Sequence, residues 1–351
     1  MKPTENRTAI ILRFIHRHFI WMIISSFIVA AMMPGFGLWI RNVSFSGAVS
    51  LPLLMLAALL FNAGLGVKTE ELTRLLQKPF ILLGGMSCNL MIPLAFIVAV
   101  SFLMHIWPEP EEVQQILVGL ALVAAMPIAG ASTAWSQNAN GSLALSLGLV
   151  LITTTLSPLL TPFVLHMAGF VTTGDYSEDL HELASGEAAS FLGIWVILPT
   201  LLGLLAHMLA GEIFISRAMP YLKIINYCIL LLLNYSNASL TLPNVVSQPD
   251  MDFLAVTLTI VVALCISAFS SGYLLARFSR VSNSETVSLV FGLGMNNNGA
   301  GLVLASVALE DHPQVMLPII FYNLAQHLVA SIADLALFKS RPPKPPLPAS
   351  V

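Results

Sequence analysis

Long apolar runs dominate this chain and are separated by short polar segments. Ten runs contain about 20 mostly apolar residues each, the length that a helix needs to cross the hydrocarbon core of a bilayer. The runs are continuously apolar and lack the alternation of a membrane β-barrel. The predicted membrane helices cover residues 20–39, 48–66, 79–104, 114–138, 142–168, 188–210, 220–239, 253–276, 285–309 and 314–337.

Two segments inside these helices interrupt the apolar pattern. Residues 127–142 and 292–301 are rich in Gly, Pro, Ser and Asn, although both lie at membrane depth. Unpaired backbone groups in hydrocarbon cost several kcal/mol each, so such segments persist only where protein or a wet cavity surrounds them. Either they are packing sites where small residues let helices approach closely, or they break their helices and leave helix ends that bind ions.

The spacing of the two interruptions favours broken helices over simple packing sites. They begin 165 residues apart in a chain of 351, and each falls in the fourth helix of a five-helix half. Because five is odd, two halves of the same fold must insert in opposite orientations, which is the pattern of a secondary transporter. We therefore predict an all-α membrane protein of ten transmembrane helices in two inverted five-helix repeats, with broken, crossing helices 4 and 9.

The charges predict how the helices are oriented. Of the 15 basic residues, 14 fall on one side of the ten-helix arrangement and only Arg41 falls on the other. Basic residues favour the cytoplasmic side, so we expect both termini to be cytoplasmic in a protein of the inner (plasma) membrane. The predicted organisation is a cytoplasmic N-terminus over 1–19, a first repeat over 20–169, an extracytoplasmic acidic loop over 170–187, a second repeat over 188–338 and a Pro-rich cytoplasmic tail over 339–351.

Composition supports the membrane class and excludes others. Hydrophobic residues make up 57% of the chain and charged residues 9%, against about 25% charged in a soluble domain. This excludes a soluble enzyme and a nucleic-acid-binding protein. The chain also lacks a zinc-protease pattern and a recognisable nucleophile–histidine spacing, so we expect no enzyme activity. The three cysteines lie in apolar runs and are expected to be small buried hydrophobes.

Three motifs resemble those of the bile acid:sodium symporter family. Gly294-Met-Asn-Asn-Asn-Gly299 is similar to the Gly-Met-Gln-Asn-Ser-Gly of its ninth helix. Residues 127–162 resemble its Pro-Gly-Gly-rich fourth helix, followed by Gly-Asp-x-Ala-Leu-Ser and a Leu-Leu-x-Pro ending. Residues 62–67 resemble the Gly-Leu end of its second helix. The resemblance covers residues 13–338 and implies a core of helices 3–5 and 8–10, a facing panel of helices 1, 2, 6 and 7, substrate in the cleft between them and two sodium ions behind the crossing.

The resemblance also places a sodium-ligand set on this chain. The acidic residue that touches both sodium sites in the family falls on Gly292, and a ligating Thr of the fifth helix falls on Val150. Both changes remove sodium ligands, although neutral hydroxyls and carbonyls can still hold sodium. The coupling ion is therefore left open between sodium, protons and none. The candidate sodium ligands are Ser132, Thr133, Ser136, Ser146, Asn296 and Asn89.

The predicted function is secondary active transport of a small organic anion by alternating access. No Lys or Arg lies deep in a predicted helix, which favours a monoanion. No cofactor is expected apart from sodium as a coupling ion, and the expected partners are the substrate and the lipid bilayer, without nucleic acid. A sodium-independent transporter and a non-transporting membrane sensor are the alternatives. The candidate substrate-binding residues are Asn296, Asn297, Asn298, Gln326 and His327.

Two polar sets in the later helices have more than one interpretation. His327 can relay protons or contact substrate, or it can be a neutral histidine bonded between helices. Polar residues at 234–239 can line the cleft or mark the end of the seventh helix near 240–243, and we favour the second. The hydroxyls of Thr153, Thr154 and Thr155 can line a cavity or bond back to their own helix.

Overall fold

The computed structural model describes residues 7–46, 49–67 and 79–338, and these residues are almost entirely helical. One small hairpin pairs β1 (Ser44–Ser46) with β2 (Val49–Ser50). The longer helices are α1 (Arg7–Met32), α3 (Leu51–Leu65), α5 (Pro79–Leu103), α6 (Pro110–Ala125), α8 (Leu143–Gly169), α12 (Glu212–Ser247), α13 (Met251–Phe278) and α16 (Met316–Ala333). The shorter helices are α2 (Gly35–Asn42), α7 (Ala131–Asn138), α9 (Asp175–Glu182), α10 (Ala188–Leu192), α11 (Leu198–Ala210), α14 (Asn283–Gly294) and α15 (Asn298–Ala308).

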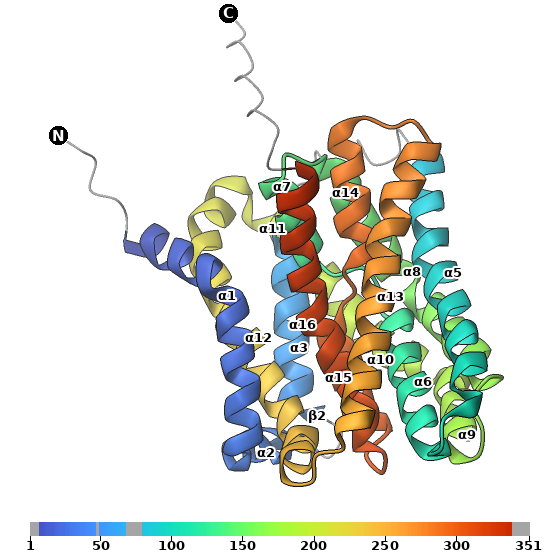
Figure 1. Ribbon diagram of the computed structural model, residues 1–351. Helices are drawn as coiled ribbons and strands as arrows, with labels where there is room; N and C mark the ends of the chain where they lie inside the picture. The colour runs from blue at the N-terminus through green and yellow to red at the C-terminus, as the bar shows by residue number, and fades with distance from the viewer. Residues whose placement is uncertain (1–6, 47–48, 68–78, 339–351) are drawn as a thin grey trace, which may run out of the picture.

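The helices form two groups that pack against each other (Figure 1). In the first group, α1 and α2 pack on α12, and α3 packs on α11 and α12. In the second, α5 packs on α6, α8 and α13, while α14 packs on α7 and α13, and α16 on α6, α13 and α15. We call the first group the panel and the second the core. This is the grouping of helices that the family resemblance implies.

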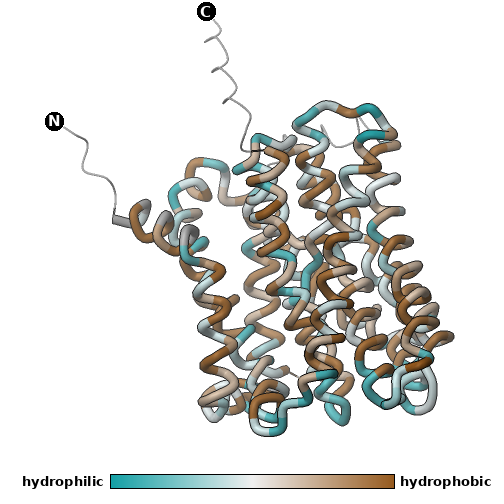
Figure 2. Tube along the Cα trace, viewed as in Figure 1, coloured by the Kyte–Doolittle hydropathy of each residue, from teal (hydrophilic) through white to brown (hydrophobic). Residues whose placement is uncertain are grey.

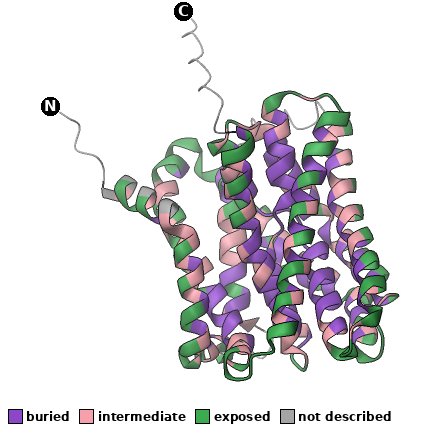
Figure 3. Cartoon of the chain, in the orientation of Figure 1, coloured by how far each residue is buried: buried purple, intermediate pink, exposed green. Residues whose placement is uncertain are grey.

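The outer surface of the molecule is apolar. Phe80 and Ile106 are 88% and 89% exposed, and many other large apolar side chains lie on the outer faces of the helices. Figure 2 shows hydrophobic colour along the middle of the helices and hydrophilic colour mainly at the turns at both ends. Figure 3 shows that buried residues gather on the central helices. A water-soluble protein does not expose so much continuous apolar surface, so this surface faces lipid.

Length and composition support part of the predicted span count. Within the described residues, six helices are long and apolar enough to cross a membrane, and the bent pair α1–α2 makes a possible seventh. The other three predicted spans are shorter. They are α3, with 15 residues, and the two interrupted helices α6–α7 and α14–α15, whose longest piece is α6 with 16 residues. Many basic residues used to predict orientation, and the tail over 339–351, lie outside the described residues.

The first predicted span is bent. Helices α1 and α2 meet at 92° across Met33 and Pro34. Proline cannot donate the hydrogen bond that would continue α1, which favours a break at this position. The hydroxyl of Tyr235 on α12 donates to the carbonyl oxygen of Met33, and a Cβ at Gly37 would overlap Ser239. The bend and α2 are therefore held on α12.

Two other helix boundaries differ from the prediction. The acidic segment over 170–187, predicted as a loop, contains α9, and Asp175 and Glu178 lie in its first turn. Acidic side chains stabilise this positive end of a helix, so charge did not prevent helix formation. Helix α12 continues to Ser247, beyond the predicted end at residue 239, and its interior includes Pro243.

Not every cysteine is buried. Cys265 is buried, Cys88 is partly buried and Cys228 is exposed on α12. The expectation for Cys228 was wrong because a membrane helix has apolar residues on its lipid-facing side as well as on its packed side.

The panel depends on close backbone packing between α3 and α11. A Cβ at Gly203 would overlap the carbonyl oxygen of Phe61, and a Cβ at Gly64 would overlap that of Thr200. The two glycines therefore let the two helix backbones touch, as small residues do in membrane helix pairs.

Candidate functional site

The two interrupted segments are broken helices, as predicted, and the breaks pair with each other. Helix α6 ends at Ala125 and α7 begins at Ala131, while α14 ends at Gly294 and α15 begins at Asn298. The N–H of Ala129 donates to the oxygen of Met295 at 2.8 Å, and the N–H of Asn297 donates to the oxygen of Pro127 at 2.9 Å. These two bonds form an antiparallel bridge that satisfies backbone groups which both helices leave unpaired.

Asn296 lies at the centre of this bridge and binds three neighbouring segments. Its side-chain Nδ2 donates to the carbonyl oxygen of Val123 at 2.8 Å, and its Oδ1 accepts from Nδ2 of Asn89 at 3.2 Å. Its backbone N–H donates to Oε1 of Gln326 at 3.1 Å. Asn296 is 2% exposed. Its polar groups are thus paired within the protein, and it connects α14–α15 to α5, α6 and α16.

Further amide side chains extend this contact to the panel. Nε2 of Gln326 donates to Oδ1 of Asn323 at 3.3 Å, and Nδ2 of Asn323 donates to Oδ1 of Asn234 on α12 at 3.4 Å. Nδ2 of Asn234 is buried without a partner in the described part of the chain. A line of amide groups therefore crosses from the core to the panel. This amide row consists of Asn89, Asn296, Gln326, Asn323 and Asn234.

The interpretation of residues 234–239 as a helix end in water was wrong. The polar side chains of this segment are at most 2% exposed, and α12 continues for two more turns. The panel packs on the core here, so these residues face protein. The signal in the sequence was a run of polar residues bounded by apolar ones on both sides, which is typical of a buried polar cluster. The buried set is Asn234, Ser236, Asn237 and Ser239.

The other candidate substrate residues have different environments. Asn297 is partly buried and caps α15, because its Oδ1 accepts from the N–H of Ala300 at 3.3 Å. Asn298 is 1% exposed, and neither atom of its amide has a partner among the described residues. His327 is buried, and its ring meets Phe19 of α1 edge-on with 5.8 Å between centroids.

Among the hydroxyl groups of the candidate sodium ligands, some make hydrogen bonds within the protein and others have no partner among the described residues. Oγ of Ser136 lies 2.9 Å from Oγ of Ser288, and Oγ1 of Thr133 donates to the carbonyl oxygen of Gly130 at 2.7 Å. Oγ of Ser132 and Oγ of Ser146 are buried and have no partner among the described residues. The two serines lie in the first turns of α7 and α8, and these helices pack on each other.

The surroundings of Gly292 are apolar. A Cβ at this position would lie 3.0 Å from Cδ1 of Leu149. Leu149 belongs to a small apolar cluster with Val150 at its edge. Within the described residues, no group of three or more His, Cys, Asp or Glu side chains could hold a metal ion. Hydroxyl, amide and backbone carbonyl oxygens are thus the ligands that the described site offers. The buried members of the cluster are Leu82, Ile128, Leu145, Leu149, Ala276, Leu289 and Leu293.

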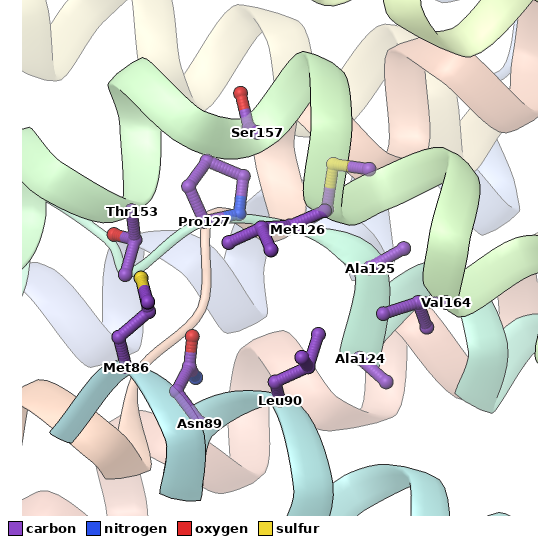
Figure 4. A pocket seen from close by; sticks show the side chains of 11 residues that line it. Met86, Asn89, Leu90, Ala124, Ala125, Met126, Pro127, Thr153, Ser157 and Val164 are labelled. Atoms are coloured by element: carbon purple, nitrogen blue, oxygen red, sulfur yellow. The ribbon is translucent and has the colours of Figure 1, made fainter. Parts of the chain in front are cut away.

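A small cavity lies beside the first break (Figure 4). Its volume is about 20 Å³, and its lining includes Asn89, Thr153 and Ser157. About 10–15 Å³ suffices for one water molecule. Oγ1 of Thr153 accepts from the N–H of Ile128 at 3.2 Å and donates to the carbonyl oxygen of Leu149 at 2.7 Å. Thr153 therefore fits both interpretations, since it lines a cavity and bonds to its own helix.

The unpartnered amide of Asn298 leads to a stability prediction. An Asn298→Leu variant keeps the branching and the number of side-chain heavy atoms, and it removes two buried unsatisfied polar atoms, each of which costs about 1–3 kcal/mol. We expect its midpoint of thermal unfolding in detergent to rise above that of the wild type. The control is Asn323→Leu, which breaks the amide row and should lower the midpoint. A lower midpoint for Asn298→Leu would show that the amide has a partner in the folded protein.

Paired broken helices inside an all-helical protein with a lipid-facing surface define a membrane transport protein of the secondary-transporter type. The Sodium Bile acid symporter family profile matches residues 53–248, more than half of the chain, and the chain belongs to this family. The resemblance seen in the motifs is thus confirmed. Proteins of this family are transporters and not enzymes.

Three relatives are similar to most of this chain. The uncharacterized protein YbaS of Bacillus subtilis (strain 168) is 27% identical over 62% of this chain and 67% of its own length. The uncharacterized sodium-dependent transporter YocS of the same organism is 22% identical over 89% of both chains. The probable sodium/metabolite cotransporter BASS2, chloroplastic, of Oryza sativa subsp. japonica is 25% identical over 82% of this chain, which spans 62% of that protein.

Proposed function

We propose that this protein is a sodium-coupled secondary active transporter that moves a small organic anion across the plasma membrane by alternating access. The observation that carries the proposal is the pair of broken helices with unpartnered, buried polar side chains beside them. Buried polar atoms without a partner are costly, so a bound ligand accounts for their presence. The family and the sodium-dependent relatives support the same function.

The proposed architecture is ten membrane helices in two inverted five-helix repeats. The support is the position of the breaks, since α6–α7 and α14–α15 are the fourth predicted helix of each half. With α3 and the two broken helices counted as spans, the panel contributes four helices and the core six. The distribution of basic residues supports cytoplasmic termini.

We place the anion at the N-terminal end of α15. This end carries partial positive charge and begins at the break with Asn297 and Asn298. The amide of Asn298 is free to donate, whereas both polar groups of Gln326 already bind protein. Neutral donors and a helix end favour a single negative charge on the substrate. The panel side of this site is Asn234, with His327 nearby on α16.

For sodium, the free hydroxyls of Ser132 and Ser146 are the first candidates. Asn89, Thr133, Ser136 and Asn296 already make side-chain hydrogen bonds within the protein and are the second candidates. The apolar cluster around Gly292 favours the second candidate function, which is the same transport without sodium. In that case His327 is the candidate proton carrier.

Uptake into proteoliposomes tests the proposal. Radiolabelled cholate, benzoate and lactate are monocarboxylates of different size, and each is offered under a sodium gradient, a proton gradient and no gradient. We expect at least one to accumulate only with sodium. Ser132→Ala and Ser146→Ala should each raise the sodium concentration for half-maximal uptake about tenfold, equivalent to about 1.4 kcal/mol of lost binding, without lowering the unfolding midpoint.

Thr257→Val is the matched control for these serine variants. Thr257 on α13 also has a buried hydroxyl without a partner among the described residues, but it lies about three turns before Phe269, which packs on Gly294. Its removal should leave sodium dependence unchanged. Accumulation under the proton gradient alone would contradict sodium coupling, and the absence of any anion uptake would favour a sensor.

A further inference from the structure

Arg41 connects the panel to the core at the end of the molecule opposite α7. It lies in the last turn of α2 and is partly buried. Its Nη1 donates to Oδ1 of Asn237 on α12 at 3.2 Å, and its Nη2 donates to the carbonyl oxygen of Ser306 on α15 at 2.8 Å. One guanidinium group thus binds one residue of the panel and one residue of the core.

The positive charge of Arg41 has only neutral hydrogen-bond acceptors in the described part of the chain. An amide oxygen and a backbone carbonyl accept its hydrogen bonds. The carboxylate of Glu310 attracts the guanidinium electrostatically but is not one of these acceptors. Partly buried charges are costly when they lack a paired counter-charge. Beside it, Nδ2 of Asn237 is fully buried without a partner among the described residues. This arrangement of a cation and a free amide donor attracts an anion.

The acceptor on the core belongs to the half-helix that begins at the proposed substrate site. α15 runs from Asn298 at the break to Ala308, and the oxygen of Ser306 is among its last four carbonyls, which have no partner within the helix. Arg41 thereby caps the negative end of the helix whose positive end faces the substrate. A second panel-to-core bond lies near this end, where Oγ1 of Thr241 donates to the oxygen of Pro313 at 2.8 Å.

Arg41 is fixed to the panel more firmly than to the core. Helix α2 packs directly on α12 at Gly37 and Ser239, and Tyr235 binds the bend before it. When panel and core separate at this end, the Arg41–Ser306 bond must break together with the Thr241–Pro313 bond. Because the acceptor is a backbone carbonyl, its release leaves the guanidinium and the Asn237 amide facing the opening.

We propose that Arg41 is the entrance residue of the transport path on the extracytoplasmic side. In the closed state it binds the Ser306 carbonyl and joins panel to core. In the open state it exchanges that carbonyl for the carboxylate of the entering substrate, and it returns to Ser306 after the anion has moved toward Asn298. This proposal rests on the proposed function for the direction of transport, whereas the closure itself is a property of the fold.

Thiol labelling tests the closure without any transport. Ser306→Cys is a reporter that is 1% exposed in this structure, placed in a chain whose three natural cysteines are replaced by alanine. A membrane-impermeant maleimide is added outside sealed proteoliposomes. We expect Arg41→Gln to increase the labelling rate of the reporter about tenfold or more, because it removes a hydrogen bond from a charged group. Arg41→Lys should give a smaller increase, since the ammonium group of lysine keeps the positive charge but replaces the two donor nitrogens of the guanidinium by one.

Uptake kinetics test the docking of the anion. For the monocarboxylate that the wild type transports fastest among cholate, benzoate and lactate, Arg41→Gln should raise KM about tenfold from the extracytoplasmic side. KM for efflux from the cytoplasmic side should stay unchanged, which a general loss of structure would not produce. The control in both assays is Ser247→Ala, because the hydroxyl of Ser247 donates to the carbonyl oxygen of Asn244 in its own helix.

Each result bears on one part of the proposal. An unchanged labelling rate in both Arg41 variants would contradict the proposal that Arg41 holds panel and core together in the closed state. An equal KM rise from both sides, or no rise from the extracytoplasmic side, would overturn the docking role. If the wild type moves no anion while Arg41→Gln still exposes the reporter, the proposed function fails together with docking, and the closure stands.

Discussion

An Asn296→Ala variant is expected to lose transport and to unfold at a markedly lower temperature than the wild type. The substitution leaves the Asn89 amide nitrogen without its partner and leaves the Val123 oxygen with only the N–H of Met126, at 3.4 Å, among the described residues. The unsatisfied nitrogen costs about 1–3 kcal/mol and the lost bond to Val123 about 1 kcal/mol, so we expect a loss of about 2–4 kcal/mol of unfolding free energy. Tryptophan fluorescence during heating in detergent measures the unfolding temperature, and proteoliposome uptake measures the loss of transport.

The neighbouring Asn297 is the matched control for this prediction. Among the described residues its side chain makes only the cap bond to Ala300, so Asn297→Ala should cost about 1 kcal/mol. If the two alanine variants were equally stable, the Asn296 contacts would not hold the breaks together. Unchanged transport by Asn297→Ala would contradict the proposed substrate contact at that residue.

A Gly203→Ala variant is expected to destabilise the panel by about 2–3 kcal/mol. The added methyl group would overlap the backbone oxygen of Phe61, and no side-chain rotation can relieve a contact with backbone. Helices α3 and α11 must therefore move apart, and overpacking of this kind typically costs about 1–3 kcal/mol. We expect a lower midpoint of thermal unfolding and reduced uptake, because the panel contributes Asn234 to the proposed substrate site.

Gly193→Ala provides the control, since Gly193 lies in the π-helical turn that joins α10 to α11 within the same membrane span. A Cβ at Gly193 would have nothing within 4 Å, and replacing a helical glycine by alanine in open space stabilises a helix by about 1 kcal/mol. A rise for Gly193→Ala together with a fall for Gly203→Ala would attribute the effect to the α3–α11 contact. A fall of equal size for both would argue against it.

The positions of the breaks could be predicted from the sequence, but the partners across them could not. Gly, Pro and Asn disfavour a continuous helix wherever they cluster, so residues 127–142 and 292–301 carry a local signal. That Ile128 would pair with Asn296 has no local signal, because the two positions lie in separate helices. The same applies to the candidate sodium ligands. Ser132 and Ser146 are free while Ser136 binds Ser288, a difference that depends on which helix packs opposite each serine.

The role of the panel residues cannot be predicted from the sequence. The pattern at 234–239 favours a helix end in water, which is wrong for Asn234, and Arg41 stands out only as an exception in the charge distribution. Both lie on helices whose polar residues also fit a helix end in water. The deciding fact is that α12 packs against the core along that stretch, and hydropathy along one helix does not contain it.

The sequence by itself determined that this protein is a helical membrane protein, where its helices run and where two of them break. These properties follow from local free energies, since transfer of apolar residues into lipid and the breaking of a helix depend on short stretches of chain. Only the tertiary structure decided which donors meet which acceptors. Asn89 binds Asn296 across 207 residues and Arg41 binds Ser306 across 265. Hydrogen bonds of this kind require correct geometry between distant segments, and that geometry arises only when panel and core pack together.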